Sequence, residues 1–421
     1  MTVHAGHGTP CLASFDGFKV NVSGDDAAGL KRLLRKAMDD RRGALLYRQR
    51  RVVNLEGSTT VEHDGRRYVN FSSNDYLGLR THPDVISAGA RAVAEHGAGS
   101  GASALISGYS PLHASAEAAL ARWKGTESAS LLPSGYQANH AVVQTIARGA
   151  EAVGGRVRFL LDKLVHASLI DPVRASGAPI RVFPHNGIEK LARLLDEADA
   201  DEVQVVVTES IFSMDGDAAD LRALAELKRR RPFVLVVDEA HGSGVYGKDG
   251  AGYAGECGVT RDVDVFIVTL SKALGSTGGA VCASTDVSDA LVNFGRAYIY
   301  STSVPPMVPA VLQAALDVLR REPQRQERVR ARSRHVRQTL RANGLALPDG
   351  DSPIIPIILG SEDAAMCEAQ RLMERGMLAM PIRPPTVPRG GSRLRITVSS
   401  EHTDEQIHAL IQAVSETKMS S

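Results

Sequence analysis

One lysine stands directly after a run of residues that is typical of a fully buried strand. The stretch VFIVTLSKALGSTGG begins at Val265 and places Lys272 between the apolar run and a string of glycines. Burial disfavours the charged form of an ammonium group, so the pKa of such a lysine is lowered and its neutral amine becomes a nucleophile. The pattern therefore indicates an amine that reacts with a carbonyl group.

Polar residues also end other apolar runs of the chain. Asp238 and His241 follow the apolar run FVLVV, Ser213 follows VVVTES, and Thr269 precedes Lys272. In open α/β sheets, ligands bind outside the carboxyl ends of the strands, so these side chains are candidates for one site. A carboxylate there is what the ring nitrogen of a pyridinium cofactor requires. The lysine and the aspartate together predict pyridoxal 5'-phosphate.

That cofactor also needs an anion site and a group against its ring. LLPSGYQANHAVVQ reads as a strand, a turn with Gly135 and Tyr136, and a helix start, and a helix N-terminus with glycine-freed amides binds phosphate. LLDKLVHASLID places His166 shortly after another strand, where an imidazole could stack on a pyridine ring. Each has a plainer interpretation alone, as an ordinary turn and a structural histidine.

Two nucleotide-binding motifs are only partly matched. VVDEAH is spelled like a helicase Walker B motif, but no G-x-x-x-x-G-K-[ST] accompanies it. GSGVYG at residues 242–247 matches G-x-G-x-x-G, but its glycine-rich continuation does not open a helix. A flexible cap over the site explains these glycines better. The alternatives from other classes of protein are a nucleotide-binding module and a catalytically inactive protein of the same fold that acts as a partner subunit.

The elements that must position these groups alternate along the chain. Between about residues 85 and 305, helical patterns alternate with short apolar runs, which predicts a doubly wound, mostly parallel α/β sheet. After Pro305, Pro306 and Pro309, a long helix through residues 310–344 and further strands predict a smaller α+β lobe. We expect an N-terminal arm and helix over 1–75, with residues 1–28 as a loose arm, a cofactor-binding domain over 76–305 and a small domain over 306–421.

Charge and composition narrow the partners. Lys and Arg number 49 against 48 Asp and Glu, so no basic field exists for nucleic acid or an anionic membrane. The cysteines form no pattern of a disulfide framework or a zinc site, and no apolar run approaches the ~20 residues of a spanning helix. We therefore expect a cytoplasmic protein that acts on small molecules without a metal. The cysteines are Cys11, Cys257, Cys282 and Cys367.

A series of longer motifs resembles one enzyme family from about residue 45 to the C-terminus. In order they are NFSSNDYLGL, GSGASALISGYSPLH, SGYQAN, HASLID, ESIFSMDGD, VDEAHGSGVYG, TLSKALGSTGG, YIYSTSVPP and RPPTVPRGGSRLRITVS. They resemble the α-oxoamine synthases, pyridoxal-phosphate enzymes of fold type I (aspartate-aminotransferase-like). The resemblance implies a large seven-stranded, mostly parallel sheet domain, a smaller C-terminal α+β domain and a homodimer.

The resemblance also implies roles for single residues. Lys272 would hold the cofactor covalently and move the substrate Cα proton, Asp238 would pair with the pyridine nitrogen, His166 would stack on the ring and His241 would bond its phenolic oxygen. The remaining cofactor-binding positions would be Gly135, Tyr136, Ser213, Thr269, Ser301 and Thr302. In this family the stretch with Ser301 and Thr302 reaches the phosphate of the neighbouring subunit.

Substrate positions follow from the same resemblance. Asn74 and Arg395 would orient the amino-acid carboxylate, while Arg48, Arg383 and Thr386 are expected near the acyl group. The implied reaction joins an amino acid to an acyl thioester, delivered by coenzyme A or a carrier protein, with loss of carbon dioxide. IRPPTVP and SSNDYLGL are most similar to the biotin-pathway branch, which uses L-alanine and a pimeloyl thioester. Glycine C-acetyltransferase, 5-aminolevulinate synthase and serine palmitoyltransferase-like branches are the alternatives.

Overall fold

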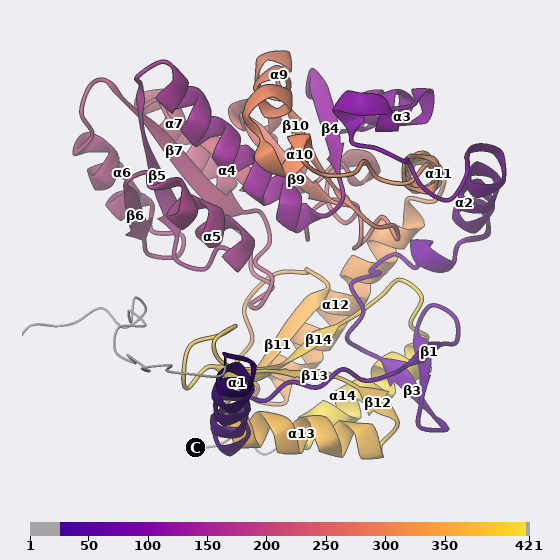
Figure 1. The fold of residues 1–421 in the computed structure, drawn as a ribbon. Helices are drawn as coiled ribbons and strands as arrows, with labels where there is room; N and C mark the ends of the chain where they lie inside the picture. The colour runs from indigo at the N-terminus through magenta and orange to yellow at the C-terminus, as the bar shows by residue number, and fades with distance from the viewer. Residues whose placement is uncertain (1–25, 418–421) are drawn as a thin grey trace, which may run out of the picture.

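The computed structural model describes residues 26–417, and these form two lobes (Figure 1). The expected loose arm over 1–28 lies almost entirely outside the described residues. The larger lobe is built on a seven-stranded sheet, and the smaller lobe carries the C-terminal part of the chain. Within residues 26–417, no helix is long and apolar enough to cross a membrane.

The large sheet has the strand order β4-β10-β9-β8-β7-β5-β6. All its strands are parallel except β10, which runs antiparallel to both neighbours. The expected mostly parallel, seven-stranded fold type I sheet is confirmed. Its strands are β4 (Ser128–Leu132), β5 (Arg156–Asp162), β6 (Ile180–Phe183), β7 (Glu202–Glu209), β8 (Val234–Asp238), β9 (Val265–Thr269) and β10 (Gly279–Ala283).

The alternation of side chains in these strands produces two cores. In β9, Val265 and Ile267 point to the face covered by α4, whereas Phe266 and Val268 join the core on the other face. Burial on both faces explains why these strands are unbroken apolar runs. The helices of this lobe are α2 (Pro83–His96), α3 (Pro111–Lys124), α4 (Gly135–Ala152), α5 (Ala167–Ser176), α6 (Ile188–Asp196), α7 (Leu221–Arg230), α8 (Tyr253–Cys257), α9 (Thr285–Phe294), α10 (Arg296–Ile299) and α11 (Met307–Arg321).

The smaller lobe packs helices on an antiparallel sheet of order β11-β14-β13. The expected single helix over 310–344 is wrong, because α11 ends at Arg321 and α12 begins at Gln324. Pro323 between them has no backbone N–H to continue the helix. The elements of this lobe are α12 (Gln324–Ala342), β11 (Ile354–Gly360), α13 (Glu362–Glu374), β12 (Met377–Leu378), β13 (Met380–Ile382), β14 (Ser392–Thr397) and α14 (Asp404–Ser415).

The N-terminal segment pairs with the small lobe through one strand. A hairpin of β2 (Thr60–His63) and β3 (Arg66–Asn70), with β1 (Asn54–Leu55) at its edge, pairs through β3 with β12. α1 (Asp26–Gly43) precedes it, and its leucines Leu30, Leu33 and Leu34 are exposed. In contrast, α11 packs on α2 and α3 of the large lobe. The domain boundaries at 75 and 305 stay predictions.

Candidate active site

Lys272 lies just beyond the carboxyl end of β9, and its amine is buried. Its Nζ is 2.8 Å from His241 Nε2. Burial lowers the pKa of Lys272 to about 8, although Asp238 and Glu209 act in the opposite direction. About a tenth of this amine is therefore uncharged at pH 7, far more than for an ordinary lysine, and the neutral form is the nucleophile.

A chain of hydrogen bonds runs from Lys272 across the site. His241 Nδ1 is 2.7 Å from the Tyr76 hydroxyl, which in turn donates to Asn74 Oδ1 at 3.2 Å. Arg395 donates to Asn74 Oδ1 at 3.2 Å and to the Tyr76 hydroxyl at 3.4 Å. The loop after β3, the end of β8 and strand β14 thus meet at one place, and both predicted carboxylate-binding residues face it.

A second set of contacts holds Asp238. Asn139 donates to Asp238 Oδ2 at 2.9 Å, and the backbone N–H of Ala240 donates to Oδ1 at 2.9 Å. Asn139 also donates to the Ser168 hydroxyl at 2.7 Å, which lies 2.7 Å from His166 Nδ1. His166 is the N-cap of α5, and burial lowers its pKa, so its ring is neutral near pH 7.

Glu209 adds a second buried carboxyl at the neighbouring strand end. It is paired in register with Asp238 across β7 and β8. Burial, followed by the nearby Asp238 charge, raises the pKa of Glu209 to about 8, and its Oε1 has no hydrogen-bond partner. Glu209 is therefore largely protonated near neutral pH.

The start of α4 lies against the end of β9. A Cβ atom added to Gly135 would stand 2.3 Å from Thr269 Oγ1, and one added to Gly279 would stand 2.6 Å from the Gly135 nitrogen. Only glycine allows this approach, which brings the N-terminal amides of an 18-residue helix to the edge that carries Lys272. The neighbouring Tyr136 ring is half exposed, with its hydroxyl 3.3 Å from Asp171 Oδ2.

The remaining predicted cofactor residues lie on two loops. Ser213, in the loop after β7, accepts a hydrogen bond from Arg395 Nε through its carbonyl at 2.5 Å. Ser301 accepts from Gln137 Nε2 at 3.3 Å, so it lies near the start of α4 in its own chain. Thr302 forms an isolated bridge with Ser103. The expected reach of this stretch to a neighbouring subunit stays a prediction.

The predicted acyl-substrate residues form a separate cluster. Arg48 donates to Thr386 Oγ1 at 3.2 Å, and Arg383 donates to the carbonyls of Leu45 and Tyr47. The segment after α1 therefore lies against the loop between β13 and β14. All three predicted residues meet there, although no hydrogen bond joins them to the contacts around Lys272 in residues 26–417.

The Walker-like motif has a structural explanation. Glu239 pairs with the buried Lys124 at 3.3 Å and accepts from the backbone N–H groups of Tyr253 and Ala254. Its oxygens are thus occupied, which argues against a magnesium-binding role. The glycine-rich segment after it is buried from His241 to Tyr246, and it packs against Ala273 rather than forming a flexible cap.

The sequence interpretation missed two residues at the centre of the site. Tyr76 lies in SSNDYLGL and Asn139 lies in SGYQAN, two of the motifs that carried the resemblance. Both contact functional side chains from distant segments: Tyr76 contacts His241, and Asn139 contacts Asp238. Neither contact follows from spacing along the chain.

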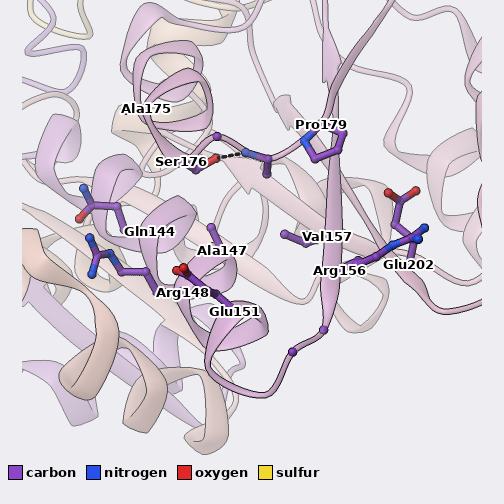
Figure 2. A pocket seen from close by; sticks show the side chains of 14 residues that line it. Gln144, Ala147, Arg148, Glu151, Arg156, Val157, Ala175, Ser176, Pro179 and Glu202 are labelled. Atoms are coloured by element: carbon purple, nitrogen blue, oxygen red, sulfur yellow. Dashed lines mark hydrogen bonds between the residues drawn. The ribbon is translucent and has the colours of Figure 1, made fainter.

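A hollow of about 680 Å³ lies away from this site (Figure 2). It is lined by the end of α4, the start of β5 and the loop after α5, including Glu151, Arg156 and Ser176. These segments belong to the amino edge of the parallel strands, whereas Lys272 lies at the carboxyl edge. None of the predicted site residues lines the hollow.

The donor set fits pyridoxal 5'-phosphate. A buried amine, an acid held by two donors and a glycine-lined helix start lie at one edge of the sheet. The orphaned Glu209 Oε1 adds a polar atom without a partner there. A lysine, a pyridinium-pairing aspartate and a phosphate-binding helix start are the groups that this cofactor uses. Fold and site together define a fold type I pyridoxal-phosphate enzyme.

Comparisons with known proteins agree with this class. Residues 66–414 match the model of the family described as aminotransferase class I and II, and the chain belongs to this family. The resemblance to α-oxoamine synthases is confirmed by 8-amino-7-oxononanoate synthase from Pseudomonas putida (strain GB-1). That protein is 43% identical over 378 residues, which cover 90% of this chain and 95% of the relative.

Two solved structures of enzymes are also similar to the structure of this chain. Serine palmitoyltransferase from Sphingomonas wittichii has a TM-score of 0.84 at 30% identity and covers 94% of this chain and 98% of its own. The 8-amino-7-oxononanoate synthase from Francisella tularensis has a TM-score of 0.71 at 27% identity and covers 83% of this chain and 97% of its own.

Proposed function

We propose that this enzyme condenses L-alanine with a pimeloyl thioester to give 8-amino-7-oxononanoate, carbon dioxide and a free thiol, a step of biotin biosynthesis. The buried Lys272 amine, hydrogen-bonded within a network that ends at Arg395, is the observation that carries the chemistry. The 43% identity to a relative of that name supports the choice of substrates. Another α-oxoamine synthase activity is the second candidate, because the structure is also similar to a serine palmitoyltransferase.

Pyridoxal 5'-phosphate is the cofactor, and the residues of the chain hold its parts. Lys272 would hold its aldehyde carbon, and Asp238 would keep the ring nitrogen protonated. The helix start at Gly135, with Thr269 and Ser213, would hold the phosphate and the edge of the ring. When bound, the cofactor withdraws electrons from the substrate Cα, which makes both deprotonation and decarboxylation possible.

The protein orients the substrates and moves one proton. Arg395 and Asn74 hold the amino-acid carboxylate, a task suited to the forked donors of arginine. Lys272 is the base that takes the Cα proton, and its lowered pKa, about 8, matches that task near neutral pH. Arg48, Arg383 and Thr386 contact the acyl group. Orientation of this kind contributes up to roughly 7–11 kcal/mol of barrier lowering.

A substrate panel tests the proposed reaction. The purified enzyme is assayed for free-thiol release with alanine plus pimeloyl thioester, glycine plus acetyl or succinyl thioester, and serine plus palmitoyl thioester. We expect the highest kcat/KM with alanine and pimeloyl thioester. A higher value with serine and palmitoyl thioester would instead identify the second candidate.

Covalent attachment is tested apart from turnover. Borohydride reduction of the holoenzyme followed by peptide mass mapping should place the cofactor on Lys272. Lys272→Ala should leave the protein without trapped cofactor, whereas Lys248→Ala, which removes an exposed lysine, should be trapped like the wild type. Trapping on another lysine would contradict the assignment.

We further infer a homodimer in the cytoplasm. Three leucines of α1 are exposed in the single chain, and a partner subunit would cover them. The balanced charge and the scattered cysteines support a cytoplasmic enzyme with neither nucleic acid nor a membrane as partner.

A further inference from the structure

Tyr76 stands at the centre of the contacts that join the two ends of the site. Its side chain is fully buried. Its hydroxyl lies 2.7 Å from His241 Nδ1, 3.2 Å from Asn74 Oδ1 and 3.4 Å from Arg395 Nη2. We propose that Tyr76 is a positioning residue that sets which nitrogen of His241 carries the proton, and thereby links the carboxylate-binding Arg395 to the amine of Lys272.

The partners of Tyr76 determine the direction of its hydrogen bonds. Arg395 can only donate, and it donates to Asn74 Oδ1, so that oxygen is an acceptor for the Tyr76 hydroxyl as well. Tyr76 can then accept the Nδ1–H of His241. In this arrangement the Nε2 lone pair faces Lys272 and accepts a hydrogen bond from its ammonium group at 2.8 Å.

The hydroxyl also supports the opposite arrangement. If the Tyr76 hydroxyl donates to His241 Nδ1, then the single ring proton of His241 is on Nε2 and faces an uncharged Lys272 amine. His241 stays neutral in both cases, because burial and the nearby Lys272 and Arg395 charges hold its pKa well below the ordinary value. The charge on Lys272 and the tautomer of His241 are therefore coupled through one hydroxyl.

Removal of the Tyr76 hydroxyl should break this coupling and lower the pKa of Lys272. In Tyr76→Phe the ring remains, but an Nδ1–H would face the guanidinium of Arg395 without an acceptor. The proton therefore moves to Nε2, and the Lys272 ammonium loses its acceptor. We expect the pKa of the Lys272 amine to fall by about one pH unit, a tenfold change in its protonation equilibrium.

Competitive labelling measures this pKa without turnover. The cofactor-free, full-length protein is treated with acetic anhydride between pH 6 and pH 10, and the acetylated fraction of Lys272 is followed by peptide mass mapping. Tyr246→Phe is the matched control, because its buried hydroxyl bonds Asp351 at 3.0 Å, outside the site. We expect a lower midpoint in Tyr76→Phe and an unchanged midpoint in Tyr246→Phe. An unchanged midpoint in Tyr76→Phe would overturn the proposal.

A second variant keeps the test open if Tyr76→Phe does not fold. Asn74→Ala removes the acceptor of the Tyr76 proton, which should then turn to His241 Nδ1 and lower the Lys272 midpoint in the same direction. An unchanged midpoint in a folded Asn74→Ala protein would also overturn the proposal.

The kinetic consequence rests on the proposed function. Because Arg395 loses one of its anchors, the KM for the amino acid should rise about tenfold in the Tyr76→Phe holoenzyme, while the KM for the acyl thioester stays unchanged. A general structural defect would lower the active fraction without this split, and equal amino-acid KM values would overturn the link to Arg395. The labelling result stands independently if no substrate pair turns over.

Discussion

Glu209 and Asp238 are in register at the ends of β7 and β8, but their hydrogen-bond partners differ. Asp238 accepts from Asn139 and from a backbone N–H, whereas Glu209 Oε1 has no partner. Two buried carboxyls this close do not both ionise easily, and burial followed by the Asp238 charge raises the pKa of Glu209 to about 8. At the scale of single residues, Glu209 is thus largely protonated near neutral pH, and Asp238 is the acid that we propose to pair with the cofactor nitrogen.

Amide substitutions distinguish these two acids. Glu209→Gln mimics a protonated carboxyl, so kcat/KM at pH 7 should change by no more than about threefold. Asp238→Asn removes the charge that holds the ring nitrogen protonated, so kcat should fall at least about a hundredfold. Steady-state assays of both variants, with the bound cofactor quantified by absorbance, make the comparison. A large loss in Glu209→Gln with little loss in Asp238→Asn would reverse the assignment.

At the scale of elements, the close contact between α4 and β9 shapes the helix start that we propose as the anion site. Gly135→Ala places a methyl group 2.3 Å from Thr269 Oγ1, so the helix start must move away from the strand end. The dissociation constant for pyridoxal 5'-phosphate should rise at least about tenfold. Gly149→Ala, at an open position of the same helix, is the control and should bind like the wild type. Absorbance titration of the cofactor-free variants measures both dissociation constants. Equal affinities in the two variants would contradict phosphate binding at the start of α4.

A histidine connects two loops at the same edge of the sheet. His185, after β6, contacts Asp162 at 3.1 Å and Asp217 at 2.6 Å, and Asp217 belongs to the loop that presents Ser213. Although burial alone would lower it, hydrogen bonds and charges from these acids raise the pKa of His185 to about 10. The ring is therefore a cation that holds two carboxylates together at neutral pH.

This contact predicts a pH-dependent stability difference. A histidine whose pKa is raised on folding stabilises the folded state fully below about pH 6.5, and the stabilisation is lost as the pH rises to about 10. His185→Asn should lower the midpoint of thermal unfolding by about 1–3 °C at pH 6 and by less at pH 10. The exposed His335→Asn serves as the control. A difference that does not shrink with pH would argue against the ion pairs.

At the scale of the whole molecule, the site draws on both lobes and on the N-terminal segment. Arg395 from β14 and Arg393, which contacts Asp215 at 2.5 Å, connect the small lobe to the loop after β7. Tyr76 and Asn74 lie in the loop after β3. Strand β3 pairs with β12 of the small lobe. A change in the relative position of the lobes would therefore alter the carboxylate site directly.

Mixed subunits test whether a partner chain completes the site. Lys272→Ala and the double variant Ser301→Ala/Thr302→Ala are each expected to be strongly impaired. If Ser301 and Thr302 serve the neighbouring subunit, unfolding and refolding the two together should restore about a quarter of wild-type activity, because half of the dimers then hold one intact site. No restoration would mean that these residues serve their own chain, where Ser301 already lies near Gln137.

Sequence and tertiary structure determined different parts of this picture. The apolar runs of β7, β8 and β9 and the polar residues that end them could be read directly, because both depend on neighbours along the chain. The break at Pro323 is local as well, because a proline has no N–H to continue a helix, but the prediction of one helix over 310–344 overlooked it. The antiparallel β10 and the pairing of β3 with β12 could not be read from the sequence, since they depend on long-range packing. By itself the sequence determined a parallel α/β enzyme with a reactive lysine and a strand-end aspartate. Only the tertiary structure decided that Tyr76 joins His241 to Arg395 and that Asn139 holds Asp238, because those contacts bridge segments far apart in the chain.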